Sequence, residues 1–198
     1  MKNILLLGIA LAGVSAANAQ TALAFKPFKV DIALGAAIPQ GSGAKAGVLF
    51  AVEPKYAVMD ELAVGLRIEA AITARGFGDA NGNFESADVA ANGSYLATGD
   101  YYFSKNTFRP FAGAGAGIFS LAKVSVKNSS TSAVEAGSKF GGMIRAGFEV
   151  AHFRLGLEYN LIGNSEQTVV SGSSTSTISS KNSYLGIKIG CFIGGGKL

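Results

Sequence analysis

The sequence has little charge, one cysteine, one histidine and a single long apolar run, and each shortage narrows the classes of protein that it can encode. Charged residues make up 15% of the 198 residues, whereas hydrophobic residues make up 48%. An exported water-soluble domain normally carries more surface charge than this. The lone Cys191 cannot form an internal disulfide, so no covalent cross-link holds the fold. The net charge of +4 is weak and scattered, which argues against nucleic acid as a partner.

The first nineteen residues have the features of a secretory signal peptide. Lys2 supplies a positive charge, residues 4–14 are apolar, and Ala17-Asn18-Ala19 forms a small-x-small cleavage site. This apolar stretch is too short to cross a bilayer as a helix, which takes about 20 residues. We therefore expect residues 1–19 to be removed after export and residues 20–198 to form one domain.

The rest of the sequence alternates apolar and polar residues with a period of two, as in strands that have one apolar face. Phe28, Val30 and Ile32 share one parity, whereas Lys29 and Asp31 take the other. The same alternation predicts eight strands, at about residues 25–38, 46–58, 62–76, 94–104, 108–121, 139–151, 153–162 and 183–194.

The connections between these strands alternate in length. Turns of a few residues follow the second, fourth and sixth strands, whereas longer polar loops occupy roughly residues 76–93, 123–138 and 163–182. This alternation is typical of an up-and-down meander closed into a barrel. Pro54 lacks the backbone N–H that a ladder needs, so it predicts a bulge or a strand end within residues 46–58.

The volume of a small barrel decides which face of the strands points inward. The interior of an eight-stranded barrel is just wide enough for its own side chains. The apolar faces carry about five large residues per strand, too many to fit, whereas the opposite faces are rich in glycine, as in the "GAGAG" of residues 113–117. We therefore expect the apolar faces to meet lipid. A phosphate-binding loop at these glycines would need a helix after them, and residues 118–126 show no helical period.

Aromatic residues and charges are also placed as a membrane barrel would need them. Tyr95, Tyr101, Phe103 and Phe108 predict an aromatic girdle at the short-turn end. Nine basic and six acidic residues have the inward parity, and buried charges must be paired. One hypothesis is that arginine–carboxylate pairs plug the lumen; the alternative is that they only stabilise the barrel. The predicted network consists of Lys29, Asp31, Glu53, Lys55, Arg67, Glu69, Arg75, Asp100, Arg109, Lys139, Arg145, Glu149, Arg154, Glu158 and Lys188.

Three stretches, "AVMDELAVGLR", "YYFSKNTFRPFAGAGAG" and "RAGFEVAHFRLGLEYNL", resemble the outer membrane protein β-barrel domain family. These are the small eight-stranded barrels of Gram-negative bacteria that are related to OmpX, OmpW and the membrane domain of OmpA. The resemblance implies an all-β, eight-stranded antiparallel up-and-down transmembrane β-barrel in the outer membrane. It also implies insertion by the barrel assembly machinery, contact with lipopolysaccharide and phospholipid, tight turns in the periplasm and loops outside. We expect a monomer.

Candidate residues for chemistry are scarce, and we expect no catalytic site, no cofactor and no metal. Some small outer-membrane barrels are lipid A-modifying enzymes that use histidine, but His152 falls in a predicted turn at the short-turn end, without a nearby serine. Residues 79–85, "DANGNFE", resemble the start of a calcium loop but lack its glycine and its last glutamate. Two other functions stay open: a narrow channel for small solutes, as in OmpW-like barrels, and recognition of a surface ligand by the Ser/Thr-rich residues 165–182.

Overall fold

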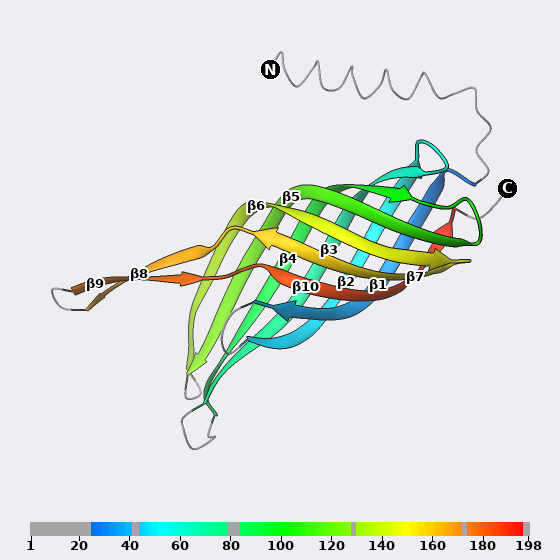
Figure 1. Cartoon of the computed structure of the whole chain (residues 1–198). Coiled ribbons are helices and arrows are strands. Elements are labelled where there is room, and N and C mark those ends of the chain that lie inside the picture. The colour runs from blue at the N-terminus through cyan, green and yellow to red at the C-terminus, as the bar shows by residue number, and fades with distance from the viewer. Residues whose placement is uncertain (1–24, 41–43, 79–83, 128–129, 172–173, 196–198) are drawn as a thin grey trace, which may run out of the picture.

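Eight antiparallel strands close into one barrel, which confirms the predicted fold class. The structure, a computed structural model, describes residues 25–40, 44–78, 84–127, 130–171 and 174–195. The barrel strands are β1 (Phe28–Pro39), β2 (Ala44–Ala57), β3 (Leu62–Gly78), β4 (Phe84–Tyr102), β5 (Phe108–Lys127), β6 (Ser130–Val150), β7 (Phe153–Ile162) and β10 (Tyr184–Gly194). Each pairs with its neighbour in the chain, and β1 pairs with β10 to complete the ring (Figure 1). Among the described residues, no helix is long and apolar enough to cross a membrane.

Three tight turns lie at one end of the barrel, which we call the turn rim. They comprise residues 58–61, 103–107 and 151–152, and the predicted short connections are confirmed. Ala151 has a φ of 53°, the left-handed conformation that a two-residue hairpin turn requires. The other connections lie at the opposite end, which we call the loop rim. The predicted signal peptide and most of the calcium-like segment at residues 79–83 lie outside the described residues.

The strands extend farther at the loop rim than their hydrophobic pattern predicts. Residues 84–93, 123–127 and 130–138 were expected in loops but belong to β4, β5 and β6. Two further strands, β8 (Ser165–Ser171) and β9 (Ser174–Ser180), form a hairpin that projects beyond the barrel (Figure 1). Backbone pairing continues in these segments, whose threonine and valine residues favour strands. Alternation of hydrophobicity therefore underestimates the length of these strands.

Pro54 neither ends β2 nor shifts its register, so the predicted bulge at this residue is wrong. Val52 lies opposite Ile68, and Lys55 lies opposite Gly65 in the same register. Each backbone N–H of a strand points toward only one neighbouring strand, so proline removes at most one ladder bond. The register shift between β2 and β3 lies instead between Lys45 and Val48.

The outer wall of the barrel is apolar, as the volume argument predicts. Twenty-five large hydrophobic side chains of the described residues are exposed, by 38% for Val150 up to 76% for Phe140. Ile118 and Ile144 on neighbouring strands are both more than half exposed, and Cys191 also faces outward. A water-soluble barrel would bury such side chains, since each is worth about 1.5–3 kcal/mol when removed from water.

Aromatic side chains gather on the outside of the turn rim. The rings of Tyr101 and Phe103 meet edge to face with centroids 5.3 Å apart. Phe108, after the turn, lies 5.5 Å from Phe148. Tyr95 does not belong to this rim, because it lies farther along β4, opposite Ile68. Such a girdle is typical of a membrane–water interface.

Replacing Gly117 by alanine is expected to destabilise the barrel. A Cβ atom at Gly117 would lie 2.0 Å from the carbonyl oxygen of Tyr95 and 2.8 Å from the Cα of Leu96, so β4 would have to move. We expect Gly117→Ala to lower the free energy of unfolding in detergent micelles by about 1–3 kcal/mol, measured by urea titration. At Gly99 a Cβ meets nothing within 4 Å, so Gly99→Ala is the matched control. Equal stability of the two variants would contradict the packing argument.

Candidate functional site

The barrel interior is occupied by a continuous network of ion pairs. Fifteen contacts between basic groups and carboxylates join twelve residues from seven strands. The charges balance, since six residues are basic and six are acidic. We call this set the lumen network; its members are Lys29, Asp31, Glu53, Lys55, Arg67, Glu69, Asp100, Arg145, Glu149, Arg154, Glu158 and Lys188.

Asp100 of β4 lies at the centre of the network and is fully buried. Its carboxylate oxygens lie 2.7 Å from Nζ of Lys55, 2.6 Å from Nε of Arg145 and 2.9 Å from Nη2 of Arg154. Three cations therefore converge on one carboxylate. Replacing that carboxylate would leave three buried positive charges with fewer partners, which is costly in a low-dielectric interior.

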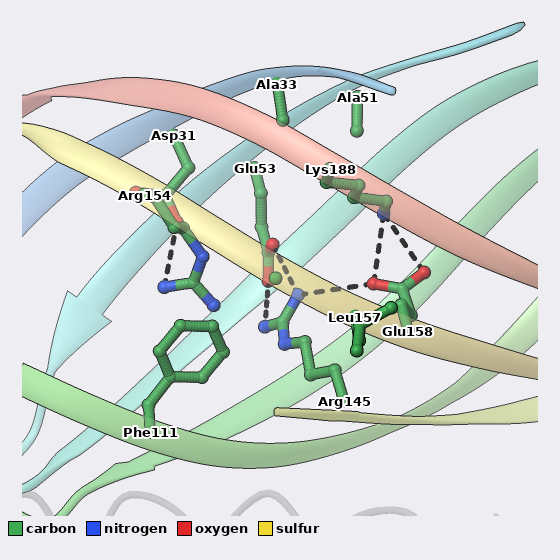
Figure 2. Close-up of a pocket in the computed structure, with 11 residues that line it drawn as sticks. Asp31, Ala33, Ala51, Glu53, Phe111, Arg145, Arg154, Leu157, Glu158 and Lys188 are labelled. Atoms are coloured by element: carbon green, nitrogen blue, oxygen red, sulfur yellow. Dashed lines mark hydrogen bonds and ion pairs between the residues drawn. The ribbon is translucent and has the colours of Figure 1, made fainter. Parts of the chain in front are cut away.

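Arg145 links the centre of the network to the part nearest the loop rim. Both of its terminal nitrogens donate to Glu53 at 2.7 Å, a bidentate contact that the planar guanidinium favours. Its Nη1 also lies 3.9 Å from Glu158 (Figure 2). The hydroxyl of Thr98 donates to Glu53 at 2.5 Å. Glu53 is thus bound from two sides of the barrel.

The part of the network nearest the turn rim is organised around Glu149 of β6. Its carboxylate accepts hydrogen bonds from Lys29 at 2.5 Å, from the hydroxyl of Tyr102 at 2.9 Å and from Arg154. The Arg154 guanidinium lies over the ring of Phe111, with its Cζ 3.6 Å from the ring centre. Aromatic faces therefore shield charges that the carboxylates neutralise.

The part nearest the loop rim is organised around Arg67 of β3, which is fully buried. It pairs with Glu158 and donates to the side-chain oxygen of Asn160 at 2.9 Å and to Ser94 at 3.0 Å. Lys188 contacts Glu158 at 3.0 Å and also pairs with Glu69. The sequence pattern identified the charges but did not single out Asn160 and Ser94, although both have the inward parity.

The glycines of β5 provide the space that these side chains occupy. A Cβ atom at Gly113 would lie 2.2 Å from Oδ1 of Asp100 and 3.2 Å from Nε of Arg145. At Gly115 it would lie 3.2 Å from the methyl carbon of Met143. The "GAGAG" segment is therefore a smooth strip of the barrel wall over which the centre of the network packs.

Three of the fifteen predicted residues lie apart from the lumen network. Arg109 is buried at the turn rim, where Nη2 donates to the carbonyl oxygen of Asp60 at 2.7 Å. Lys139 is half-buried near the loop rim, and its Nζ lies 2.6 Å from the carbonyl oxygen of Asn164. The backbone of Arg75 lies in β3, but its side chain is outside the part of the structure that is described.

An apolar layer, which the sequence analysis did not predict, lies between the network and the loop rim. Leu96 and Phe119 are fully buried, and Leu49 and Met143 nearly so. The layer consists of Ala37, Leu49, Ala71, Leu96, Phe119, Leu121, Met143, Ile162 and Tyr184. Parity could have identified these residues, because Leu49 shares the parity of Glu53 and Lys55 on β2.

The space left beside the described part of the lumen network is small. The cavity between Asp31, Glu53, Phe111 and Lys188 measures about 30 Å³ (Figure 2). A buried water needs about 10–15 Å³, so this cavity has room for water but not for a typical organic ligand. Within the described residues, no group of three or more metal-ligating side chains is present.

The fold matches solved structures of small outer-membrane barrels. Neisserial surface protein A (NspA) gives a TM-score of 0.55 at 16% identity, over 84% of this chain and 96% of that one. OprG from Pseudomonas aeruginosa gives 0.53 at 10% identity, over 87% and 98% of the two chains. Ail, the attachment invasion locus protein of Yersinia pestis, gives 0.49 at 14% identity, over 85% and 99%. No protein-family model matches the sequence, and the search of curated proteins finds no match.

The class of protein follows from the strand arrangement together with these matches. The chain has the fold of the small eight-stranded outer-membrane β-barrels, with a closed ring of antiparallel strands and an apolar outer wall. This confirms the fold expected from the family resemblance. At these identities the likeness defines the fold alone, so the function has to be argued from the residues of this chain.

Replacing Asp100 by asparagine is expected to destabilise the barrel strongly. The amide keeps the shape of the side chain but removes the charge that faces Lys55, Arg145 and Arg154. We expect the free energy of unfolding in micelles to fall by about 3–5 kcal/mol, the range for breaking one side of a buried pair. Urea titration followed by far-UV circular dichroism measures this change, since the chain has no tryptophan for fluorescence.

Glu61→Gln is the control for this experiment. Glu61 lies in a tight turn at the barrel surface and accepts a hydrogen bond from Lys105, which lowers the pKa of Glu61. Pairs exposed to solvent contribute little to stability, so this variant should unfold at nearly the wild-type urea concentration. If Asp100→Asn were as stable as Glu61→Gln, the network would not be needed to hold the barrel together.

Proposed function

We propose that this chain is an integral outer-membrane protein without catalytic activity, exported to the cell envelope of a Gram-negative-type cell. The observation that carries the proposal is the inverted distribution of side chains. Twelve charged residues of the described part are buried, whereas twenty-five large hydrophobic residues are exposed. Lipid is the surrounding in which such a wall is stable, because hydrocarbon does not penalise exposed apolar side chains and the closed ring leaves no strand edge unpaired.

The lumen of the proposed protein is closed. A solute moving along the axis would have to separate the ion pairs around Asp100 and then displace the apolar layer around Phe119. Each disrupted buried pair costs several kcal/mol, so no open pathway is compatible with the folded interior. The network therefore serves to fill and stabilise the barrel.

The absence of catalysis is part of the same proposal. His152, the residue that a lipid A-modifying enzyme would need, lies exposed in the turn after β6, and its ring packs 5.3 Å from that of Phe192. The buried carboxylates are each bound to cations and do not face a cavity large enough for a lipid or sugar. These placements favour a structural role.

The remaining role is at the loop rim. Strands β3 to β6 continue past the end of β7, since β6 begins at residue 130 but pairs with β7 only from Gly141. The β8–β9 hairpin projects separately (Figure 1). We propose that these extensions present a surface to ligands outside the cell, while the wall contacts lipopolysaccharide and phospholipid. Insertion would need the barrel assembly machinery, and one copy forms a complete barrel.

Unheated gel electrophoresis tests the proposed membrane barrel. Protein extracted from outer membranes with detergent should migrate as a compact band that shifts to a higher apparent mass after boiling, because a closed barrel resists unfolding by the detergent of the gel. The same chain in buffer alone should aggregate, since its wall is apolar. A folded, stable monomer in buffer without detergent would refute the proposal.

Planar-bilayer recording tests whether the lumen is closed. Purified protein inserted into the bilayer should give no steady conductance, whereas a general porin added to the same bilayer should open as usual. The heat-modifiable band of the sample establishes beforehand that the protein is folded. A steady conductance of porin size would favour the channel hypothesis, and it would leave the membrane location intact.

A further inference from the structure

A cavity at the turn rim lies outside the lumen network and is larger than the cavity within it. It measures about 120 Å³, compared with about 30 Å³ in the lumen. Two tight turns, Phe25 and the end of β10 enclose it. A water needs about 10–15 Å³, so the cavity has room for several waters or one small polyatomic ion. Its polar lining residues are Asn106, Thr107, Arg109 and His152, and none of its described lining residues is acidic.

Arg109 supplies a fixed positive charge at this cavity. Only 8% of the residue is exposed, and it takes part in none of the fifteen ion pairs of the lumen network. Its guanidinium lies between two rings, with Cζ 4.1 Å from the centre of Phe25 and 4.0 Å from that of Tyr102. The faces of the group are covered, so hydrogen bonds can form only along its edges.

The hydrogen bonds of Arg109 leave part of that edge unused. Nη2 donates to the carbonyl oxygen of Asp60 at 2.7 Å, whereas the buried Nε has no hydrogen-bond partner among the described residues. A buried donor without an acceptor is costly, about 1–3 kcal/mol, and charged donors cost more. Nε itself has almost no accessible surface, so an oxyanion in the cavity would act by compensating the guanidinium charge of Arg109, which lines it.

The opposite wall of the cavity is formed by the turn after β6 and the end of β10, which contact each other. The backbone N–H of Phe192 donates to the carbonyl oxygen of His152 at 2.9 Å, and the two rings pack together. This contact joins the turn after β6 to the end of β10. Thr107 and Asn106, in the turn before β5, add a hydroxyl and an amide to the same lining.

We propose that the turn-rim cavity binds a small oxyanion, a carboxylate or a phosphate group, with Arg109 as its principal ligand. A guanidinium fork matches the two oxygens of such a group, and the aromatic walls strengthen the contact by excluding water. Thr107 and His152 contact the remaining oxygens. The site is separate from the closed lumen, so a carboxylate or phosphate bound there does not enter the barrel.

Calorimetric titration of the folded protein tests the site. In phosphate-free dodecyl maltoside micelles, inorganic phosphate or acetate should bind with saturation, and Arg109→Gln should weaken that binding at least tenfold. Lys105→Gln is the control, because it removes one positive charge from the same rim at a residue that does not line the cavity. This control should change the dissociation constant less than twofold.

Arg109→Gln cannot be used if it lacks the heat-modifiable band, because that variant is then not folded. Two variants in the turns then test the site instead. Thr107 and His152 are exposed, so Thr107→Val and His152→Ala should fold, and each should weaken binding at least threefold. Absence of saturable binding to the wild type, or equal affinity of the wild type and the folded variants, would overturn the proposal. A loss as large in Lys105→Gln would indicate nonspecific attraction and overturn it as well.

A second arm identifies the source of the oxyanion. The same titration is repeated in nanodiscs of phosphatidylglycerol, whose headgroups lie beside the turn rim of an inserted barrel. If the site takes lipid phosphate, the apparent dissociation constant for added phosphate should rise at least tenfold over its value in micelles. An unchanged value would assign the site to soluble anions. Either result presupposes saturable binding in micelles.

Discussion

Burial of charge inside a wall that faces hydrocarbon is the constraint on which the rest of the structure depends. Each strand must carry its apolar residues on one face and its ionic residues on the other, because lipid excludes charge and the narrow lumen excludes bulk. Asp100 with its three cations shows the consequence. The balance between six basic and six acidic residues leaves the network without a net buried charge.

Glycines on the inward face of the strands provide the space for these buried side chains. Long side chains from β4 and β6 meet above β5 only because Gly113 and Gly115 have none. The apolar layer around Phe119 follows the same rule, since a Cβ at Gly141 would lie 2.8 Å from Cε2 of that ring. Large residues on one strand are thus matched to glycines on a neighbouring strand, where no side chain competes for the space.

The barrel could be predicted from the sequence because apolar and polar residues alternate with a period of two along the middle of its strands. Lys29 and Asp31 face the lumen, whereas Phe28 faces outward. The lumen requires polar side chains and the outer wall requires apolar ones, so the alternation is strict there. Toward the loop rim the strands continue beyond the apolar stretches, so the predicted strand ends near residues 94 and 121 were wrong. Pro54 misled for another reason, because the loss of one ladder bond is tolerated without a bulge.

The candidate site was only partly accessible from the sequence. The alternation of residues along a strand shows which charges face the lumen. It does not show how far along the barrel axis each charge lies, because that depends on the register between strands. Arg109 and Lys139 therefore could not be separated from the central network, although they lie toward opposite rims. The cavity beside Arg109 was equally hidden, because its walls come from two turns and both ends of the described chain.

Closure through β1 and β10 also determines the order in which the molecule can be completed. Lys29 and Asp31 come from the first strand, whereas Lys188 comes from the last, so the electrostatic interior is unfinished until the whole polypeptide is available. Every shorter intermediate has two open sheet edges and unneutralised ions, which makes it prone to aggregation. A chain truncated before Tyr184 would lack β10 and therefore the β1–β10 pairing that closes the ring.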